Sequence, residues 1–165
     1  MISEFIKPSV PLVPEYIKLP PLDQIETRFV APQILVFRVD SLDTQDSIVR
    51  DLQDGLATTI KVMPFIAADV IPDDAERGTI QLEIGEDAGV WFHVQEVPEL
   101  NFKVLQKQQF APVALPVVQL MPEPRLHNWE RSPVLTIQAT FITGGLLLVL
   151  FFTCCSCRGD MLIAL

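Results

Sequence analysis

The feature that most constrains this chain is an uncharged stretch at residues 134–157. A bilayer-spanning helix needs about 20 apolar residues, so the stretch is long enough to form one. Residues 135–141, however, alternate between apolar and polar side chains, which is typical of a half-buried strand. Gly144 and Gly145 separate them from a second apolar run, and glycine takes the positive φ of tight turns. The stretch therefore favours a β-hairpin. The alternative is a C-terminal membrane anchor on a small acidic head.

Composition indicates a chain with a core of its own. Hydrophobic residues make up 49% of the 165 residues and charged residues 20%, which excludes global disorder. The net charge of −9, without a basic stripe, excludes nucleic acid as a partner, because phosphate binding needs clustered Lys and Arg. The start of the chain lacks the basic and apolar regions of a secretory signal. We therefore expect a cytoplasmic location, or a single-pass membrane location if residues 134–157 are a helix.

Local patterns in the first third of the chain predict an extended entry, a strand and a helix. Five prolines in the first thirty residues exclude a helix interior and a central strand, so residues 1–32 are expected to enter the fold as an extended segment. Residues 33–39 are rich in branched side chains and predict a strand. In residues 43–61 apolar side chains recur every four positions, which predicts an amphipathic helix.

The middle of the chain predicts further strands. Pro64 breaks the helix before a short strand. Residues 79–85 and 90–97 both alternate, and the turn-forming residues between them predict a second hairpin. Residues 98–133 are rich in proline and predict a surface crossing with one short helix near residues 100–107. This order of elements indicates an α/β fold built from a mixed sheet with helices.

Four segments, taken in order, resemble a known enzyme family. They are Pro21-Leu22-Asp23-Gln24 before a strand, Met63-Pro64-Phe65-Ile66-Ala67-Ala68 after a helix, the predicted hairpin at residues 79–97, and the segment from Pro133 through Gly144-Gly145-Leu146-Leu147-Leu148. Together they resemble the BAHD-type acyl-CoA-dependent acyltransferases, in particular the fungal branch typified by trichothecene 3-O-acetyltransferase.

The resemblance implies a fold and a reaction. The fold would be an incomplete N-terminal domain of a chloramphenicol-acetyltransferase-like two-domain architecture, with residues 33–152 as the partial domain. The reaction would be acyl transfer from acyl-CoA to a metabolite hydroxyl in fungal secondary metabolism. The partners would be acyl-CoA, as a co-substrate rather than a tightly bound cofactor, and a small-molecule alcohol. Because the family runs to about three times this length, the resemblance implies a truncated chain.

The family places His-x-x-x-Asp-Gly after the strand that follows Gly-Gly. The resemblance implies that the histidine is the general base for the acceptor hydroxyl and that the aspartate orients the loop. Counting from Gly145, the base position falls at Cys154 and the acid position at Arg158, followed by Gly159. Residues 153–165 are therefore expected to be a divergent tail, with no intact catalytic, cofactor-binding or metal-binding residue, and the chain is predicted to be inactive.

Other candidate sites have simpler interpretations. Cys154, Cys155 and Cys157 suggest a nucleophile, a zinc site or palmitoylation, but no base or fourth ligand is evident, and incidental replacement of the lost motif is favoured. His93 is interpreted as a solvent-facing or core-edge side chain, and His127 as part of the proline-rich crossing. The scattered acidic residues are interpreted as solvated surface: Asp40, Asp43, Asp46, Asp51, Asp54, Asp73 and Asp74. We also expect poor solubility, because a last hairpin without neighbouring strands would expose an apolar edge.

Overall fold

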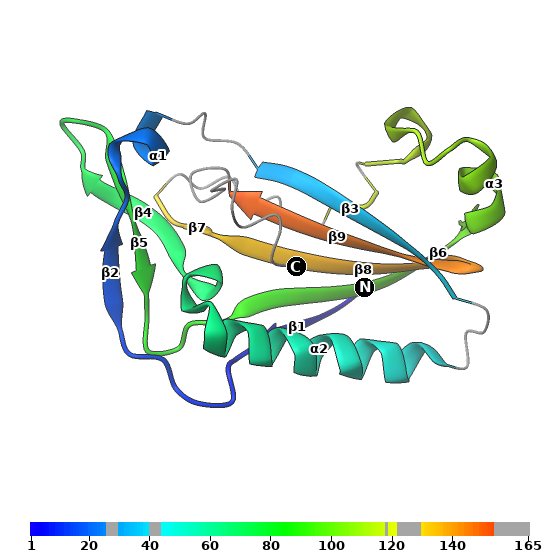
Figure 1. The fold of residues 1–165 in the computed structure, drawn as a ribbon, viewed down its shortest axis with the longest axis horizontal. Helices are drawn as coiled ribbons and strands as arrows, with labels where there is room; N and C mark the ends of the chain where they lie inside the picture. Colours follow the sequence, from blue (N-terminus) through cyan, green and yellow to red (C-terminus); the bar gives the residue numbers. More distant parts are fainter. Residues whose placement is uncertain (26–29, 40–43, 118, 122–129, 154–165) are drawn as a thin grey trace.

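The structure, a computed structural model, describes residues 1–25, 30–39, 44–117, 119–121 and 130–153. Two sheets form its framework, and helix α2 runs along one face of the larger sheet (Figure 1). The larger sheet has the order β1 (Ile2–Ile6), β6 (Val90–Asn101), β8 (Leu135–Thr143), β9 (Gly145–Thr153) and β3 (Val30–Arg38). The smaller sheet has the order β2 (Glu15–Lys18), β5 (Thr79–Ile84), β4 (Asp69–Asp74) and β7 (Ser132–Pro133). The helices are α1 (Pro21–Ile25), α2 (Gln45–Val62) and α3 (Phe102–Lys107), with short 3-10 turns at Pro64–Ala67 and Pro112–Ala114.

The uncharged stretch forms the predicted hairpin. Strands β8 and β9 pair antiparallel, with Ile142 opposite Gly145, so that Thr143 and Gly144 make the turn. Gly144 takes a φ of 77°, the left-handed conformation that glycine adopts without steric cost. The hairpin prediction is confirmed and the membrane-helix alternative is wrong, because these residues are paired as sheet. Within the described residues, no helix is both long enough and apolar enough to cross a bilayer.

Strand β8 is buried on both faces, so its prediction as a half-buried strand is wrong. Its apolar face packs in a cluster with Leu56 and Ile60 of α2. Its polar face is equally enclosed, because Gln138 and Thr140 are 0% exposed. On that side, residues from the 102–121 segment lie in one cluster with Leu147, Val149 and Phe151 of β9. The polar and apolar residues that alternate along β8 therefore face two different buried layers, and neither set faces solvent.

The predicted hairpin of residues 79–97 is wrong, because its two strands lie in different sheets. Strand β5 pairs with β2 and β4, whereas β6 pairs with β1 and, in parallel, with β8. The turn-forming residues between them carry the chain from one sheet to the other. At Gly89 a Cβ would lie 2.6 Å from the Ile6 carbonyl oxygen, so the glycine permits a close crossing rather than a hairpin turn. The hairpin partner of β5 is β4.

The proline-rich start contributes one strand to each sheet. Strand β1 lies at one edge of the larger sheet and β2 at one edge of the smaller, positions that agree with the exclusion of a central strand. Pro21 opens the short helix α1, where a missing amide hydrogen costs nothing. The predictions of a strand at residues 33–39 and of helices at residues 43–61 and 100–107 are confirmed as β3, α2 and α3, with small shifts at the ends.

The sequence analysis expected the last hairpin to form an exposed edge, but other strands form the edges of the larger sheet. The last hairpin lies inside the sheet, with β6 beside β8 and β3 beside β9. The expectation that this hairpin lacks neighbouring strands is therefore wrong. Among the described strands, β1 and β3 are the outer ones. Strand β3 exposes Phe37 at 46% and is the apolar edge that bears on solubility.

Candidate functional site

Strand β9 carries the chain to the junction between the two sheets, beside β7 (Figure 1). Its last residue, Thr153, is buried, and its amide donates to the Val134 carbonyl oxygen at 3.0 Å. The Thr153 hydroxyl donates to the Pro133 carbonyl oxygen at 2.7 Å and lies 3.4 Å from the Ser132 hydroxyl. Cys154 follows Thr153 directly in the sequence. The last described residue before the predicted base position is therefore held between the two sheets.

The predicted motif residues themselves lie outside the described residues. This applies to Cys154, Cys155, Cys157, Arg158 and Gly159, and to the tail at residues 153–165 beyond Thr153. His127, Asp40 and Asp43 also lie outside. Their roles stay predictions. In the described part of the chain, no group of three His, Cys, Asp or Glu side chains is arranged to hold a metal ion.

His93 occupies a buried position, so of its two interpretations the solvent-facing one is wrong and the core-edge one agrees with the structure. It is 7% exposed, and its Nδ1 lies 2.8 Å from the Ser3 hydroxyl. The indole of Trp91 stacks near it, with ring centroids 6.2 Å apart. Burial lowers the pKa of His93 below its ordinary value, which favours the neutral imidazole. These contacts give His93 a structural role between β6 and β1.

A row of buried amides and hydroxyls next to His93 was missed by the sequence analysis. Gln138 lies opposite His93 in the parallel pairing of β6 and β8. Its Nε2 donates to the Thr140 hydroxyl at 3.2 Å, and Gln95 Nε2 donates to the same oxygen at 3.1 Å. Among the residues that the structure describes, the buried Gln138 Oε1 has no hydrogen-bond partner. The alternating polar residues of β8 carried this signal, but they were interpreted as a solvent face.

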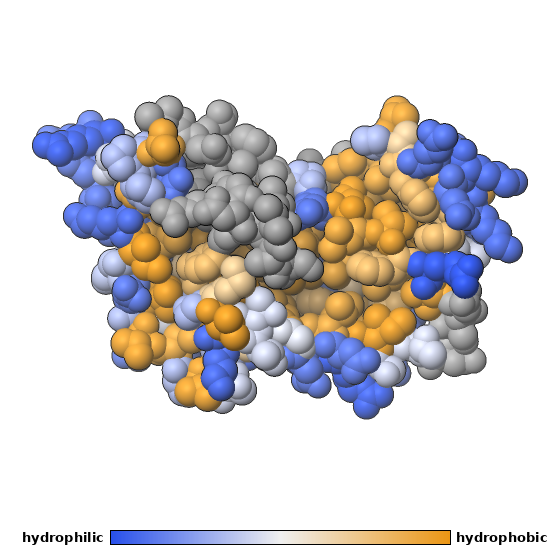
Figure 2. All heavy atoms as spheres, in the orientation of Figure 1, coloured by the Kyte–Doolittle hydropathy of each residue, from blue (hydrophilic) through white to orange (hydrophobic). Residues whose placement is uncertain are grey.

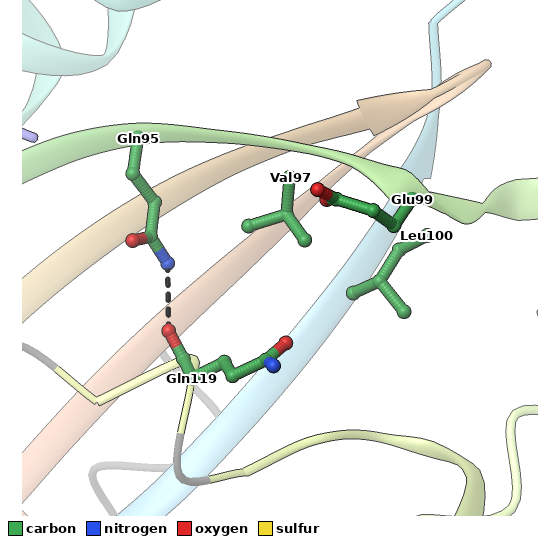
Figure 3. Close-up of a pocket in the computed structure, with 5 residues that line it drawn as sticks. All are labelled: Gln95, Val97, Glu99, Leu100 and Gln119. Atoms are coloured by element: carbon green, nitrogen blue, oxygen red, sulfur yellow. Dashed lines mark hydrogen bonds between the residues drawn. The ribbon is translucent and has the colours of Figure 1, made fainter.

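A cavity of about 490 Å³ opens at the far end of this row. It is lined by Gln95, Val97, Glu99, Leu100 and Gln119, and Gln95 Nε2 donates to the Gln119 carbonyl oxygen at 2.9 Å (Figure 3). Gln95 pairs with Thr140, and Thr140 with Leu147, six residues before Thr153. At roughly 3.3 Å per residue, the cavity lies about 20 Å from the end of β9. It is therefore a separate feature, without a nucleophile or an imidazole base.

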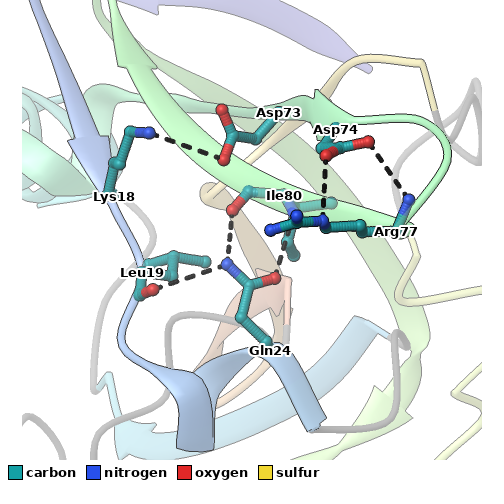
Figure 4. A network of polar contacts seen from close by, with 7 residues as sticks. All are labelled: Lys18, Leu19, Gln24, Asp73, Asp74, Arg77 and Ile80. Atoms are coloured by element: carbon teal, nitrogen blue, oxygen red, sulfur yellow. Dashed lines mark hydrogen bonds and ion pairs between the residues drawn. The ribbon is translucent and has the colours of Figure 1, made fainter.

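The segment Pro21-Leu22-Asp23-Gln24 has a clear structural role. Gln24 accepts a hydrogen bond from the Ile80 amide at 3.0 Å and donates to the Ile80 carbonyl oxygen at 2.7 Å, as a neighbouring strand would (Figure 4). Its side chain also donates to the Leu19 carbonyl oxygen at 3.5 Å. Gln24 thus fastens α1 to β5. Nearby, Asp73 pairs with Lys18 and Asp74 with Arg77 at the surface, in line with the interpretation of these aspartates.

The family described as "Trichothecene 3-O-acetyltransferase-like N-terminal domain" matches residues 32–157. The chain belongs to this family. The resemblance to the fungal branch of BAHD-type acyltransferases is thereby confirmed. The match ends at Cys157, inside the segment that was expected to replace the catalytic motif.

Two relatives of this family member are named as acyltransferases. Acyltransferase easC of Emericella nidulans is 31% identical over 164 residues, which cover 93% of this chain and 34% of the relative. Acyltransferase cm3D of Cordyceps militaris is 28% identical over 87% of this chain and 33% of the relative. The chain therefore spans about a third of the length of these relatives.

A solved structure confirms the fold. Fusarium graminearum TRI101, complexed with coenzyme A and T-2 mycotoxin, superposes with a TM-score of 0.77 at 19% identity, over 88% of this chain and 36% of TRI101. The predicted fold class, an incomplete α/β N-terminal domain of this architecture, is confirmed by that partial match. Membership of an acyltransferase family follows from the family match and from the two named relatives.

Proposed function

We propose that this chain supplies the N-terminal part of an acyl-CoA-dependent O-acyltransferase and that, with Cys154 and Arg158 in the motif positions, it does not transfer acyl groups itself. The observation that carries the proposal is the end of β9. The strand that starts at Gly145 ends at Thr153, buried between the sheets and one residue before the base position. In this view residues 1–32 enter the fold, residues 33–152 form the partial domain and residues 153–165 are a divergent tail.

The chemistry of the two substituted positions supports inactivity. The reaction needs a base that takes a proton from the acceptor hydroxyl as its oxygen attacks the thioester carbonyl. A histidine, with an ordinary pKa of about 6.5, is largely neutral at pH 7 and accepts that proton, whereas a cysteine thiol, at about 8.5, is largely protonated. Arginine at position 158 carries a permanent positive charge and only donates hydrogen bonds, so it cannot orient the loop as a carboxylate does.

The ligands of the proposed parent reaction are acyl-CoA and a small-molecule alcohol. Support comes from TRI101, whose structures are complexed with coenzyme A and with T-2 mycotoxin or deoxynivalenol. Acyl-CoA would act as a co-substrate and would not stay bound between turnovers. A cytoplasmic location is part of the same proposal.

A chimera tests the proposal directly. Residues 1–165 replace the matching third of acyltransferase easC, either unchanged or with Cys154→His and Arg158→Asp, which restore His-x-x-x-Asp-Gly. Acyl transfer from acetyl-CoA to a panel of hydroxylated metabolites is followed by mass spectrometry. We expect at least about a hundredfold more transfer by the restored chimera, since a general base contributes 10²–10⁴-fold. Equal transfer by both chimeras would refute the roles given to the two positions. Turnover by residues 1–165 alone would refute the proposed inactivity.

A further inference from the structure

A ladder of polar side chains crosses the outer face of the smaller sheet. Tyr16 of β2 lies opposite Glu83 of β5, and Glu83 lies opposite Asp69 of β4. Tyr16 donates to Glu83 Oε1 at 2.8 Å, and Arg131 Nη1 donates to Asp69 Oδ2 at 2.6 Å. The other Arg131 nitrogen, Nη2, pairs with Glu83 Oε2. Four side chains from four parts of the chain are therefore joined in one row, and the row ends at Arg131, directly before β7.

Strand β7 needs support of this kind because it is very short. It pairs with β4 through two residue pairs only, Asp69 with Pro133 and Val70 with Ser132. Pro133 has no amide hydrogen to donate to that pairing. Arg131 adds ion pairs to both β4 and β5, and the Val134 amide donates to the Ala68 carbonyl oxygen at 2.9 Å. The position of β7 thus depends on the side chain of Arg131 as well as on the backbone.

The other side of β7 holds the end of β9. Thr153 contacts Ser132, Pro133 and Val134, on or next to β7, while on its other side it lies opposite Val30 of β3. Arg131 directly precedes β7, and Ser132 and Pro133 of β7 contact Thr153, so β7 links the row of side chains to the end of β9.

We propose that Tyr16, Glu83, Asp69 and Arg131 form a positioning clamp that fixes β7 and, through it, the point where the chain leaves β9 for the motif positions. The proposal deepens the proposed function, because it assigns positioning residues to the same site. The clamp contains no reacting atom. Its electrostatics agree with this role: hydrogen bonds from Tyr16 and Arg131 lower the pKa of Glu83, so the carboxylate stays ionised and paired at neutral pH.

Amide hydrogen exchange of the full chain, followed by NMR, tests the clamp. In Arg131→Met we expect the Thr153 and Val134 amides to exchange about two- to thirtyfold faster, the range for the loss of one or two ion pairs at a partly exposed site. The Val39 amide, which donates to the Gly144 carbonyl oxygen at the opposite end of β9, is the internal reference and should not change. Arg77→Met is the matched control, because Arg77 pairs with Asp74 away from β7.

Two further variants make the result decisive. Arg131→Lys keeps the charge but not the geometry that lets one guanidinium pair with two carboxylates, so it should accelerate exchange of the Thr153 amide less than Arg131→Met does. It replaces Arg131→Met if that variant fails to fold. Glu83→Gln should also accelerate exchange of the Thr153 amide without affecting exchange of the Val39 amide. Unchanged exchange at Thr153 in a folded Arg131 variant, or equal acceleration by Arg77→Met, would overturn the clamp. Amide exchange does not depend on acyl transfer. The chimera experiment can therefore refute the proposed function while the clamp is supported, and the exchange experiment can refute the clamp while the proposed function is supported.

Discussion

Replacing Gly145 by alanine tests whether close packing, rather than the turn, requires the second glycine of the pair. A Cβ on Gly145 would lie 2.9 Å from the Phe37 carbonyl oxygen and 2.8 Å from Phe102 Cδ2. The first of these atoms belongs to the backbone of β3. The second belongs to a ring that packs against Phe110, with centroids 5.5 Å apart. Neither can move away easily, so the sheet must open where β3, β9 and α3 meet.

Gly144 offers a matched comparison, because its constraint is of a different kind. A Cβ there would meet only Phe102 Cβ, at an ordinary 3.8 Å, but the residue has a φ of 77°. Left-handed backbone costs a non-glycine residue roughly 1–2 kcal/mol, partly offset by the lower entropy of the unfolded chain. Overpacking at Gly145 costs about 1–3 kcal/mol in cores that can adjust, and contact with backbone favours the upper end. We expect losses of about 1 kcal/mol for Gly144→Ala and about 3 kcal/mol for Gly145→Ala.

Urea unfolding followed by circular dichroism measures both losses. Gly144→Asn should be closer to wild type than Gly144→Ala, because asparagine tolerates the left-handed region. The same change at Gly145 should be at least as damaging as alanine, because a larger side chain meets the same atoms. If Gly145→Ala were neutral, or if Gly144→Ala were the more damaging variant, the close approach of Phe37 and Phe102 would not be what fixes this glycine.

Three other predictions follow from buried or exposed side chains. Gln138→Met removes one hydrogen bond and a buried oxygen that has no partner among the described residues, so the free energy of unfolding should change by no more than about 1 kcal/mol. Gln138→Glu buries a charge and should be several kcal/mol less stable at pH 7 in the same urea assay. Burial holds the pKa of His93 below its ordinary 6.5, so the unfolded chain binds the proton more readily and the free energy of unfolding should fall as the pH drops below 6.5. His93→Gln should flatten this part of the profile of stability against pH, and an unchanged profile would contradict the reasoning. Phe37→Lys on the outer strand β3 should reduce self-association in light scattering, whereas Val113→Lys, at a 95% exposed position away from the strand, should leave it unchanged.

Local sequence determined those elements whose signal lies within a few residues. The repeat of apolar side chains every four residues gave α2, and the glycine pair between two apolar runs gave the β8–β9 hairpin. The segments around Pro21, Pro64 and Gly144, taken in their order along the chain, indicated the family. Each of these depends on backbone preferences or on the spacing of side chains along one element, and both are properties of the chain before it folds.

Strand partners and layers were decided only by the tertiary structure. Turn-forming residues between β5 and β6 suit a hairpin and a crossing between sheets equally well, and only the pairing of β5 with β2 and β4 selects the crossing. The polar side chains of β8 have the pattern of a solvent face, yet Gln138 and Thr140 are fully buried. The contact between Arg131 and Glu83 joins residues 48 apart in the sequence. Such contacts follow from which surfaces can be buried together, and a local pattern does not contain that information.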